Sequence, residues 1–388
     1  MTAASQHTYD EPYKPINVFI VFLVCAAALV GVPVYVYFNG ITGYEVAAYI
    51  FFHMVPGLSI TAGYHRLFSH QAYSAHWSVR LFFAIFGAAA IQNSILAWSR
   101  HHRVHHRFVD DPVKDPYSIK RGFLHAHIGW VLKDQVKNPE LERVNLRDLE
   151  NDPIVMWQHK YYWYIVIATN IVLPLALGAL VGRPLGVFMF ATVLRLFVVE
   201  NIIFSTNSFC HMWGKRPYTD ANTARDSHLM GIFLLGEGYH NFHHRFEYDY
   251  RNGHHWYDID LTKWVIAALG AIGLTYNLRR ASALQIHNAV TSMALKNADK
   301  KLENCDNWAH ARMQLEELRT RMLEKISDWE DTKEQLHAML AEKRSETSAK
   351  VEELKARMED SRKQWMEARE QFRAQLSAAF QQSSMVAA

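Results

Sequence analysis

Histidine is concentrated in three short groups of the sequence. The chain of 388 residues contains 22 histidines, and the groups occupy positions 65–70, 102–106 and 240–244. In the second and third groups the histidines stand at positions i, i+3 and i+4, a spacing that places them on one face of a helix. The two histidines of the first group stand five residues apart, about 140° around a regular helix. We therefore expect those two to serve different metal ions or to lie across a helix end.

Imidazole nitrogen is a ligand for iron, copper, zinc and nickel, so the residue type alone does not name the metal. Asn207 and His211 form a further i, i+4 pair at the end of an apolar segment, where polar side chains are candidates for function. With His211 the candidate imidazoles number nine, more than one ion of about four to six coordinates can bind. Two ions would use all of them. An isolated residue such as His76 is best explained as a surface histidine, but chance does not explain three spaced groups.

Long apolar segments must position these groups. Half of the residues (50%) are hydrophobic, and they cluster near 16–38, 44–62, 161–181 and 185–205. At about 1.5 Å per residue, each cluster is long enough to cross a bilayer as a helix. A further apolar run, 81–98, would put the first two histidine groups on opposite sides of the membrane if it crossed. We therefore predict that this run is buried in the protein or lies at the interface, which leaves four transmembrane helices in two hairpins.

The distribution of charge predicts the orientation. The long segment between the hairpins carries many lysines and arginines, whereas the turn at 39–43 carries none. Because positively charged loops favour the cytoplasm, we expect the histidine groups and an N-terminal tail of residues 1–15 on the cytoplasmic side. The membrane would be a bacterial inner membrane or an ER-type membrane, and residues 16–285 would form the membrane domain.

The C-terminal part of the chain differs in character. Residues 288–376 contain no proline or glycine, and their apolar side chains recur at steps of three, four and seven residues. We expect residues 286–388 to form a coiled-coil-like helical extension or a helical hairpin. It either self-associates, giving a homo-oligomer, or docks on a redox partner or on lipid. The expected fold class is an all-α integral membrane protein, with a cytoplasmic helical domain that holds a two-metal site and a C-terminal helical extension.

Composition excludes several classes of protein. With 41 basic and 38 acidic residues the net charge is +3, which is too small to indicate a nucleic-acid-binding surface. Three cysteines lie far apart, so neither a disulfide framework nor a zinc ribbon is predicted, and a reducing compartment fits. The sequence has no haem motif of a fused cytochrome b5, no clustered cysteines for iron–sulfur and no complete GxGxxG. Electrons for redox chemistry would come from a separate protein.

Five motifs carry a resemblance to a known family. They are GYHRLFSH at 63–70, Trp98 followed by HRVHH at 102–106, Arg121-Gly122-Phe123 with Gly129-Trp130, Asn207 to His211, and GEGYHNFHH at 236–244. Together they resemble the membrane fatty-acid desaturases over about residues 15 to 280. The branch that they resemble is the acyl-CoA delta-9 (stearoyl-CoA type) branch, in a bacterial-like form without a fused cytochrome b5 domain.

The resemblance implies a centre of two Fe2+ ions with O2 as co-substrate. The implied reaction removes hydrogen from two adjacent methylenes of a long-chain acyl-CoA and leaves a cis double bond, with electrons from a ferredoxin- or cytochrome b5-type donor and its reductase. Asn207 is implied to act through a water. The implied iron ligands are His65, His70, His102, His105, His106, His211, His240, His243 and His244.

The resemblance also implies where the substrate binds. The candidate substrate-binding residues are Gln92, Asn93, Trp98, Arg100, Ile203 and Phe204. Asp134 and Gln135 occupy what resembles an Arg-Lys pair for the phosphates of CoA in animal members, and a carboxylate does not bind phosphate as Arg does. The adjacent Lys133 is able to compensate. Acyl-CoA is therefore the first expected substrate, with acyl-lipid and acyl-carrier-protein as alternatives.

Two other functions remain open at this point. A membrane fatty-acid hydroxylase uses the same kind of two-iron, histidine-rich site, and ligands alone do not decide between removing a second hydrogen and returning oxygen to carbon. A histidine-rich metal transporter or sensor fits less well, because such proteins tend to carry histidine tracts in disordered loops or a polar path through the bilayer.

Overall fold

The structure is a computed structural model, and it divides the chain into two compact units. Residues 1–216 with 221–280 form the first unit, and residues 217–220 with 281–388 form the second. The described residues are 11–134, 138–303, 305, 307–341 and 348–386. Residues 1–10 of the expected N-terminal tail, and Gln135, lie outside them.

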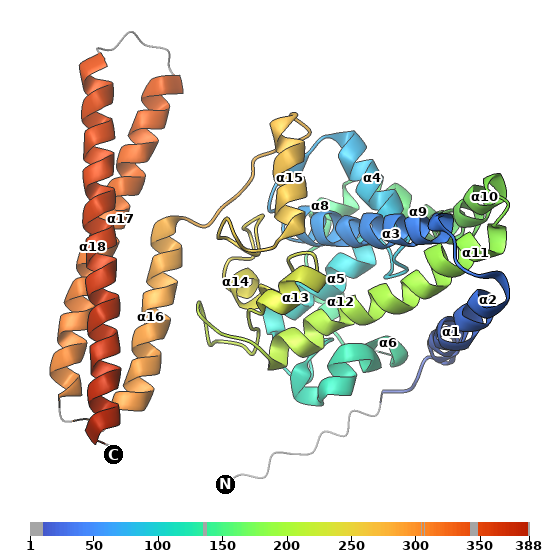
Figure 1. Cartoon of the computed structure of the whole chain (residues 1–388), viewed down its shortest axis with the longest axis horizontal. Coiled ribbons are helices and arrows are strands. Elements are labelled where there is room, and N and C mark those ends of the chain that lie inside the picture. The colour runs from blue at the N-terminus through green and yellow to red at the C-terminus, as the bar shows by residue number, and fades with distance from the viewer. Residues whose placement is uncertain (1–10, 135–137, 304, 306, 342–347, 387–388) are drawn as a thin grey trace. The chain divides into compact units, whose positions relative to one another are not determined.

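Among the described residues of the first unit, four helices are long and apolar enough to cross a membrane (Figure 1). They run from Pro15 to Asn39, Gly43 to Ser69, Pro153 to Leu180 and Pro184 to Met212. Within them α-helical and π-helical parts alternate: α1 (Pro15–Ala26), η1 (Ala27–Gly31) and α2 (Val32–Asn39); α3 (Gly43–Leu58) and η2 (Ser59–Ser69); α9 (Pro153–Ile167), η5 (Ala168–Val172) and α10 (Leu173–Leu180); α11 (Pro184–Phe188), η6 (Met189–Leu194) and α12 (Arg195–Met212).

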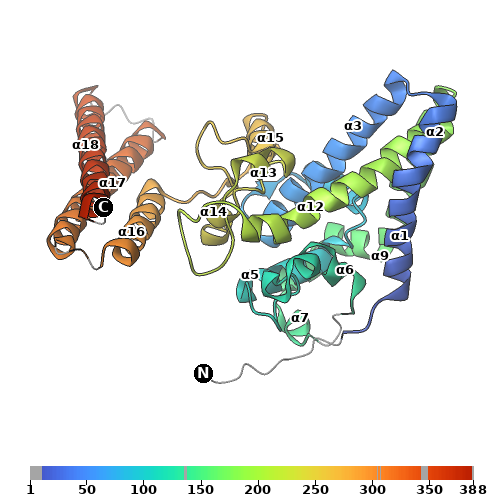
Figure 2. The same cartoon turned by 60° about the horizontal axis from the view of Figure 1, so that its bottom comes forward.

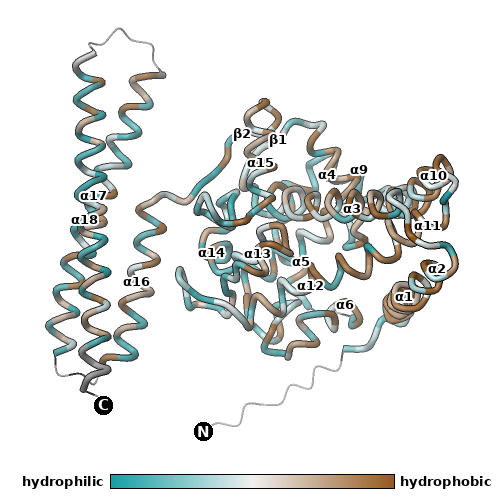
Figure 3. Tube along the Cα trace, viewed as in Figure 1, coloured by the Kyte–Doolittle hydropathy of each residue, from teal (hydrophilic) through white to brown (hydrophobic). Residues whose placement is uncertain are grey.

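Short turns join these helices into two hairpins, as the sequence predicts. The first turn contains Gly40, whose φ of 66° ends α2, and Thr42, which caps α3 in a capping box with Glu45. The second contains Gly182 with φ of 68° before Pro184 at the start of α11. Figure 2 shows α3 and α12 side by side, and Figure 3 shows that the spans are predominantly apolar. The predicted all-α membrane fold is confirmed.

The apolar run at 81–98 does not cross a membrane, in agreement with the parity argument. It is divided between α4 (Trp77–Ala88), which is too short to span, and the first turn of α5 (Ile95–Phe108). Ile91 and Asn93 adopt positive φ between them, and Ser94 caps α5. The inner face of α4, which includes Phe83 and Ala84, is buried in a core shared with η2 and α5.

The remaining elements of the first unit are short. The strands β1 (Ser74–Ala75) and β2 (Thr275–Tyr276) pair antiparallel. The helices are η3 (Ile119–Arg121), η4 (His125–Gly129), α6 (Trp130–Leu132), α7 (Glu140–Arg143), α8 (Arg147–Glu150), α13 (His228–Phe233), α14 (His240–Arg245) and α15 (Leu261–Ala271).

The described part of the second unit forms three helices: α16 (Ala283–Leu302), α17 (Trp308–Ala341) and α18 (Ser348–Val386). α17 and α18 form an antiparallel hairpin (Figure 1). Leu315, Met322 and Ile326 of the predicted apolar stripe are buried, and Phe372 of α18 packs with Leu315 in one cluster. Of the two expected forms, the described residues adopt the hairpin, and α16 packs on it as a third helix because its own apolar side chains complete the core.

Candidate metal centre

All nine histidines that the sequence selects come together in two adjacent groups. In each group the ring nitrogens, one from each residue, lie within 4.8 Å of one another. Each group is therefore compact enough to hold one metal ion. The five-histidine group contains His65, His70, His102, His106 and His243, and the four-histidine group contains His105, His211, His240 and His244.

The first histidine pair differs from the geometry of a regular helix. His65 lies in η2, and His70 is the residue directly after the end of η2 at Ser69. The backbone N–H of His70 donates to the carbonyl of His65 at 3.1 Å, an i to i+5 bond that widens the turn. The two rings consequently lie 4.9 Å apart between centroids and in the same group. His65 and His70 thus fall in one group and lie across a helix end, which is the second of the two arrangements that the sequence offers.

The helices α5 and α14 each contribute to both groups. On α5, His102 and His106 at i and i+4 belong to the five-histidine group, while His105 faces the four-histidine group. On α14, His243 belongs to the former and the i, i+4 pair His240 and His244 to the latter. The spacing that the sequence shows thus makes each helix a bridge between two sites.

Within each group, the Nε2 atoms of neighbouring histidines lie close to one another. The distances are 2.9 Å for His65–His243, 2.7 Å for His70–His102, 3.0 Å for His106–His243, 3.1 Å for His211–His240 and 3.0 Å for His240–His244. Nitrogens that bind one ion at about 2.1 Å and at right angles to each other lie about 3.0 Å apart. The observed spacing fits a shared metal ion.

Carboxylates at the opposite ring nitrogens of three histidines favour the tautomer that this spacing requires. Nδ1 of His65 lies 2.8 Å from Glu237, Nδ1 of His105 lies 2.8 Å from Asp115 and Nδ1 of His106 lies 3.0 Å from Glu247. An imidazole that donates Nδ1–H to a carboxylate leaves the lone pair on Nε2. The Nε2 lone pairs then face one another without a proton, and the buried Nε2 of His105 has no hydrogen-bond partner among the described residues. These unprotonated nitrogens are electron-pair donors, so the two groups are suited to binding metal cations.

A second layer of polar residues holds the four-histidine group. Nδ1 of His211 lies 2.8 Å from Oγ1 of Thr223, which in turn donates to Asp110 at 2.6 Å. Asp115, the partner of His105, accepts the backbone N–H of Asp110 at 3.0 Å. Residues of the loop after α5 and of the loop after α12 therefore orient two imidazoles together.

Arg66 and Glu237 form the corresponding layer behind His65. Arg66 is buried and donates to Glu237 at 2.9 Å and to Asp260 at 3.1 Å. Burial alone raises the pKa of Glu237, but the charges and hydrogen bonds of His65 and Arg66 outweigh burial and lower that pKa to about 2. Glu237 therefore remains a carboxylate and an acceptor for the Nδ1–H of His65.

The three imidazoles of α14 are held neutral. Burial, followed by the neighbouring imidazoles, lowers the pKa of His240, His243 and His244 well below the ordinary value for histidine. Neutral imidazole is the form that binds metals. The environment therefore favours metal binding over protonation.

Sequence reasoning assigned no role to Glu237, Asp115, Glu247, Asp110 or Thr223. Glu237 stands within the GEGYHNFHH motif, and that adjacency to three candidate ligands was the available signal. Asp115 follows the second histidine group by nine residues and Glu247 follows the third by three, a weaker signal that many surface carboxylates share.

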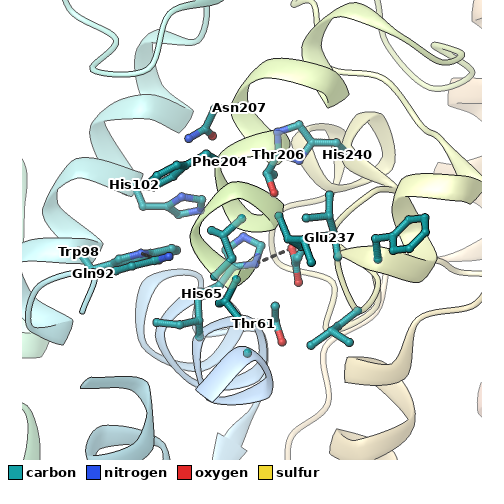
Figure 4. Close-up of a pocket in the computed structure, with 18 of the residues that line it drawn as sticks. Thr61, His65, Gln92, Trp98, His102, Phe204, Thr206, Asn207, Glu237 and His240 are labelled. Carbon is teal, nitrogen blue, oxygen red and sulfur yellow. Dashed lines mark hydrogen bonds and ion pairs between the residues drawn. The ribbon is translucent and has the colours of Figure 1, made fainter. Parts of the chain in front are cut away.

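An apolar cavity adjoins the centre, with an empty volume of about 890 Å3 that includes space open to solvent. His65 and His102 of the five-histidine group and His240 of the other line it (Figure 4). Trp98 stacks on His102 at 4.7 Å between ring centroids, and its Nε1–H donates to Gln92 at 3.2 Å.

The cavity is lined by most of the residues predicted to contact substrate. Gln92, Trp98, Ile203 and Phe204 belong to its wall, and so does Asn207. Asn93 and Arg100 are not among the described residues that line it. Asn93 is exposed, and its backbone N–H donates to the hydroxyl of Tyr162 at 3.0 Å.

Comparison with known proteins identifies the family. The family model described as "Fatty acid desaturase" matches residues 44–280, which include all nine histidines. The chain belongs to the fatty acid desaturase family. This family assignment, together with the four apolar helices, makes the protein an integral membrane protein.

Similar curated proteins are desaturases of acyl-CoA by name, in agreement with the branch that the motifs indicate. Acyl-CoA desaturase 1 of Saccharomyces cerevisiae is 40% identical over 261 residues, 67% of this chain and 50% of its own length. Stearoyl-CoA desaturase of Capra hircus is 38% identical over 237 residues, 60% of this chain and 66% of its own. Stearoyl-CoA desaturase of Homo sapiens is 34% identical over 277 residues, 70% of this chain and 75% of its own. The chain thus spans about half the length of the yeast relative.

Proposed function

We propose that this desaturase introduces a cis double bond into a long-chain acyl-CoA, at the delta-9 position, in an O2-dependent reaction at two iron ions. The observation that carries the proposal is the convergence of nine imidazoles, in two groups, at the wall of an apolar cavity. The proposed iron ligands are the members of the two groups, with Asn207 acting through a water.

A redox metal is needed because an unactivated C–H bond offers no acidic proton to a side chain. When bound, the iron pair would let O2 act as the oxidant: with two electrons from the donor and two protons, O2 is reduced to two waters as two hydrogens leave the substrate. The protein's part is to hold the ligands and to position the substrate.

The cavity provides the positioning. Its apolar wall, which includes Ile60, Val199, Ile202 and Ile203, binds an acyl chain and excludes water from the reacting carbons. His65 and His102 bring the five-histidine group to the same wall. Trp98, stacked on His102 and hydrogen-bonded to Gln92, gives the wall a rigid surface beside the centre, so that one pair of methylenes is presented rather than many.

The carboxylates behind the ligands keep the centre assembled. Glu237, Asp115 and Glu247 accept from Nδ1, which fixes the tautomer and increases the basicity of Nε2. Because Arg66 is shared between Glu237 and Asp260, its charge is compensated inside the protein.

Acyl-CoA is the proposed carrier, in accordance with the names of the relatives. Asp134 replaces a basic residue of the resembled pattern, and Lys14 lies 3.4 Å from it. Together with Lys133, Lys14 leaves positive charge at this position for the phosphates of CoA. The proposed electron donor is a separate ferredoxin- or cytochrome b5-type protein with its reductase. The catalytic side is proposed to be cytoplasmic, and the C-terminal helices are proposed to mediate self-association.

Product analysis in a desaturase-deficient host tests the proposal. Expression of the wild type in air should produce cis-monounsaturated acyl chains that are absent without O2, as measured by gas chromatography with mass spectrometry. His105→Ala should abolish them, because it removes the ligand whose Nε2 lacks another partner. His310→Ala, in the exposed surface of α17, is the matched control and should retain full activity.

The same chromatogram separates the rival function. Hydroxylated chains without alkenes would identify a hydroxylase and overturn the proposed reaction. Alkene production by His105→Ala at the wild-type rate would overturn the proposed site.

A further inference from the structure

The exposed face of α15 is entirely apolar. Its exposed side chains and the one directly after the helix stand at i, i+3, i+4, i+7 and i+8, so they form one stripe along the helix. Trp264 is 45% exposed and Ile272 is 70% exposed. The stripe consists of Trp264, Ala267, Ala268, Ala271 and Ile272.

The other face of α15 is fixed to a membrane span. The hydroxyl of Thr262 lies 2.8 Å from that of Thr61 in η2, and Ile266 is fully buried in the core shared with η2 and α4. The one charged side chain of the helix, Lys263, turns away from the stripe and donates to the carbonyls of Gly253 and His255 at 2.7 and 2.6 Å. The stripe therefore carries no charge.

This arrangement does not suit a surface in water. A helix of 11 residues is about 16 Å long and cannot cross a bilayer. A helix with a continuous exposed apolar stripe and its polar groups turned inward matches the pattern of helices that lie in the membrane interface. Figure 1 shows α15 running across the direction of α3, as expected for a helix parallel to the surface of a bilayer that α3 crosses.

Exposed aromatic residues precede α15 in the chain and also lie at the strand pair that follows it. Before α15, Trp256 is 86% exposed and Tyr257 is 56% exposed; beyond it, Trp77 is 61% exposed and Tyr276 is 51% exposed. The pairing of Ser74 with Tyr276 joins the start of α4 to the end of this segment. Trp and Tyr are enriched at the level of the lipid headgroups, where one part of the ring is apolar and another is hydrated.

We propose that α15 is an interfacial helix whose stripe lies in the lipid bilayer, with the bordering aromatic residues at the headgroup level. The lipid is the favoured occupant because α15 packs against a span of the same unit through its buried face, so the bilayer that receives the span also reaches the exposed stripe. The helix is tied to the substrate cavity as well, since both the N–H and the hydroxyl of Thr262 donate to the carbonyl of Leu235, a residue of the cavity wall. Insertion of α15 thereby anchors this part of the cavity wall to a helix held in the bilayer.

Site-directed spin labelling of the full chain in lipid nanodiscs tests this placement without measuring activity. Cys25 and Cys305 are replaced by Ser, and Cys210 is retained because it is fully buried. A label is then attached at Ala268→Cys. Val30→Cys, 62% exposed on the first span, is the lipid-facing reference, and Glu142→Cys, exposed on α7, is the water-facing reference.

Collision of each label with O2, which concentrates in lipid, is compared with collision with a water-soluble nickel chelate. The ratio of O2 to nickel collisions at position 268 should exceed that at 142 by at least about threefold and approach that at 30, as expected of a side chain below the headgroups. A ratio equal to that at 142 would overturn the proposal. The measurement is repeated in discs that contain a single copy of the protein. If the label at position 268 is protected from nickel only in discs with more than one copy, a second copy covers the stripe and the proposal is overturned.

Discussion

Replacing Glu237 with Gln tests whether the carboxylates behind the histidines maintain the metal centre. Glu237→Gln keeps the size of the side chain but removes the charge that His65 and Arg66 contact at 2.8 and 2.9 Å. The amide is a weaker acceptor for Nδ1–H, so the Nε2 lone pair of His65 becomes less basic and its orientation less fixed.

The expected loss follows from the role of such partners in metal sites. Removal of a residue that orients a metal-bound histidine typically weakens metal binding by about 10- to 100-fold, or roughly 1.4 to 2.7 kcal/mol. A single ligand of the five in its group is affected, so the centre should still form at high metal concentration. We expect Glu237→Gln to release iron at a chelator concentration about 10- to 100-fold lower than the wild type.

The assay is competition for Fe2+ between the purified protein and a chromogenic chelator under anaerobic conditions. Asp249→Asn is the matched control, because Asp249 is also buried and accepts from Arg251 at 2.7 Å. Circular dichroism must show that both variants are folded. Iron affinity of Glu237→Gln within a factor of two of the control would refute the reasoning that the carboxylate acts through His65.

Three further predictions concern the supporting layer, the core and the metal. Thr223→Val removes the hydroxyl between Asp110 and His211 and should weaken iron binding about tenfold in the same competition, whereas Thr320→Val on exposed α17 should not. Gly87→Ala puts a methyl group into the ring of the buried Tyr64 and should lower the free energy of unfolding by about 1 to 3 kcal/mol, as measured by thermal unfolding. The control is Gly43→Ala, whose methyl group meets nothing within 4 Å and which should leave that free energy unchanged or raised. Chelation of the metal should lower the melting temperature, since a ligand at 100 times its Kd stabilises by about 2.7 kcal/mol; an unchanged melting temperature would contradict a metal bound to the folded state.

The grouping of the histidines was predictable because their positions follow helix periodicity. The i, i+3 and i+4 spacing of His102, His105 and His106 becomes a helix face in α5, and the parity of the apolar segments places the groups on one side. The placement of His65 and His70 in one group could not be predicted in this way, because an i to i+5 bond widens η2. Sequence spacing alone does not distinguish a π-helical turn from an α-helical one.

The supporting residues and the role of α15 were harder to predict for a different reason. Glu237 meets His65 only after the chain has folded through two further spans, and such pairings depend on tertiary contacts rather than on local pattern. The stripe of α15 consists mainly of alanine, which gives a weak apolar signal, and its exposure becomes evident only when Thr262 and Ile266 are seen to face inward.

The most direct test of the proposed two-iron desaturase is a titration of the metal-free, purified protein with Fe2+, followed by reaction with stearoyl-CoA, O2 and a chemical or protein reductant. Gas chromatography of the released acyl chains measures the alkene formed at each equivalent of iron. We predict that cis-monounsaturated product appears as the second equivalent binds and reaches its maximum at two irons per chain. Full activity at one equivalent, or no alkene at any loading, would contradict the account.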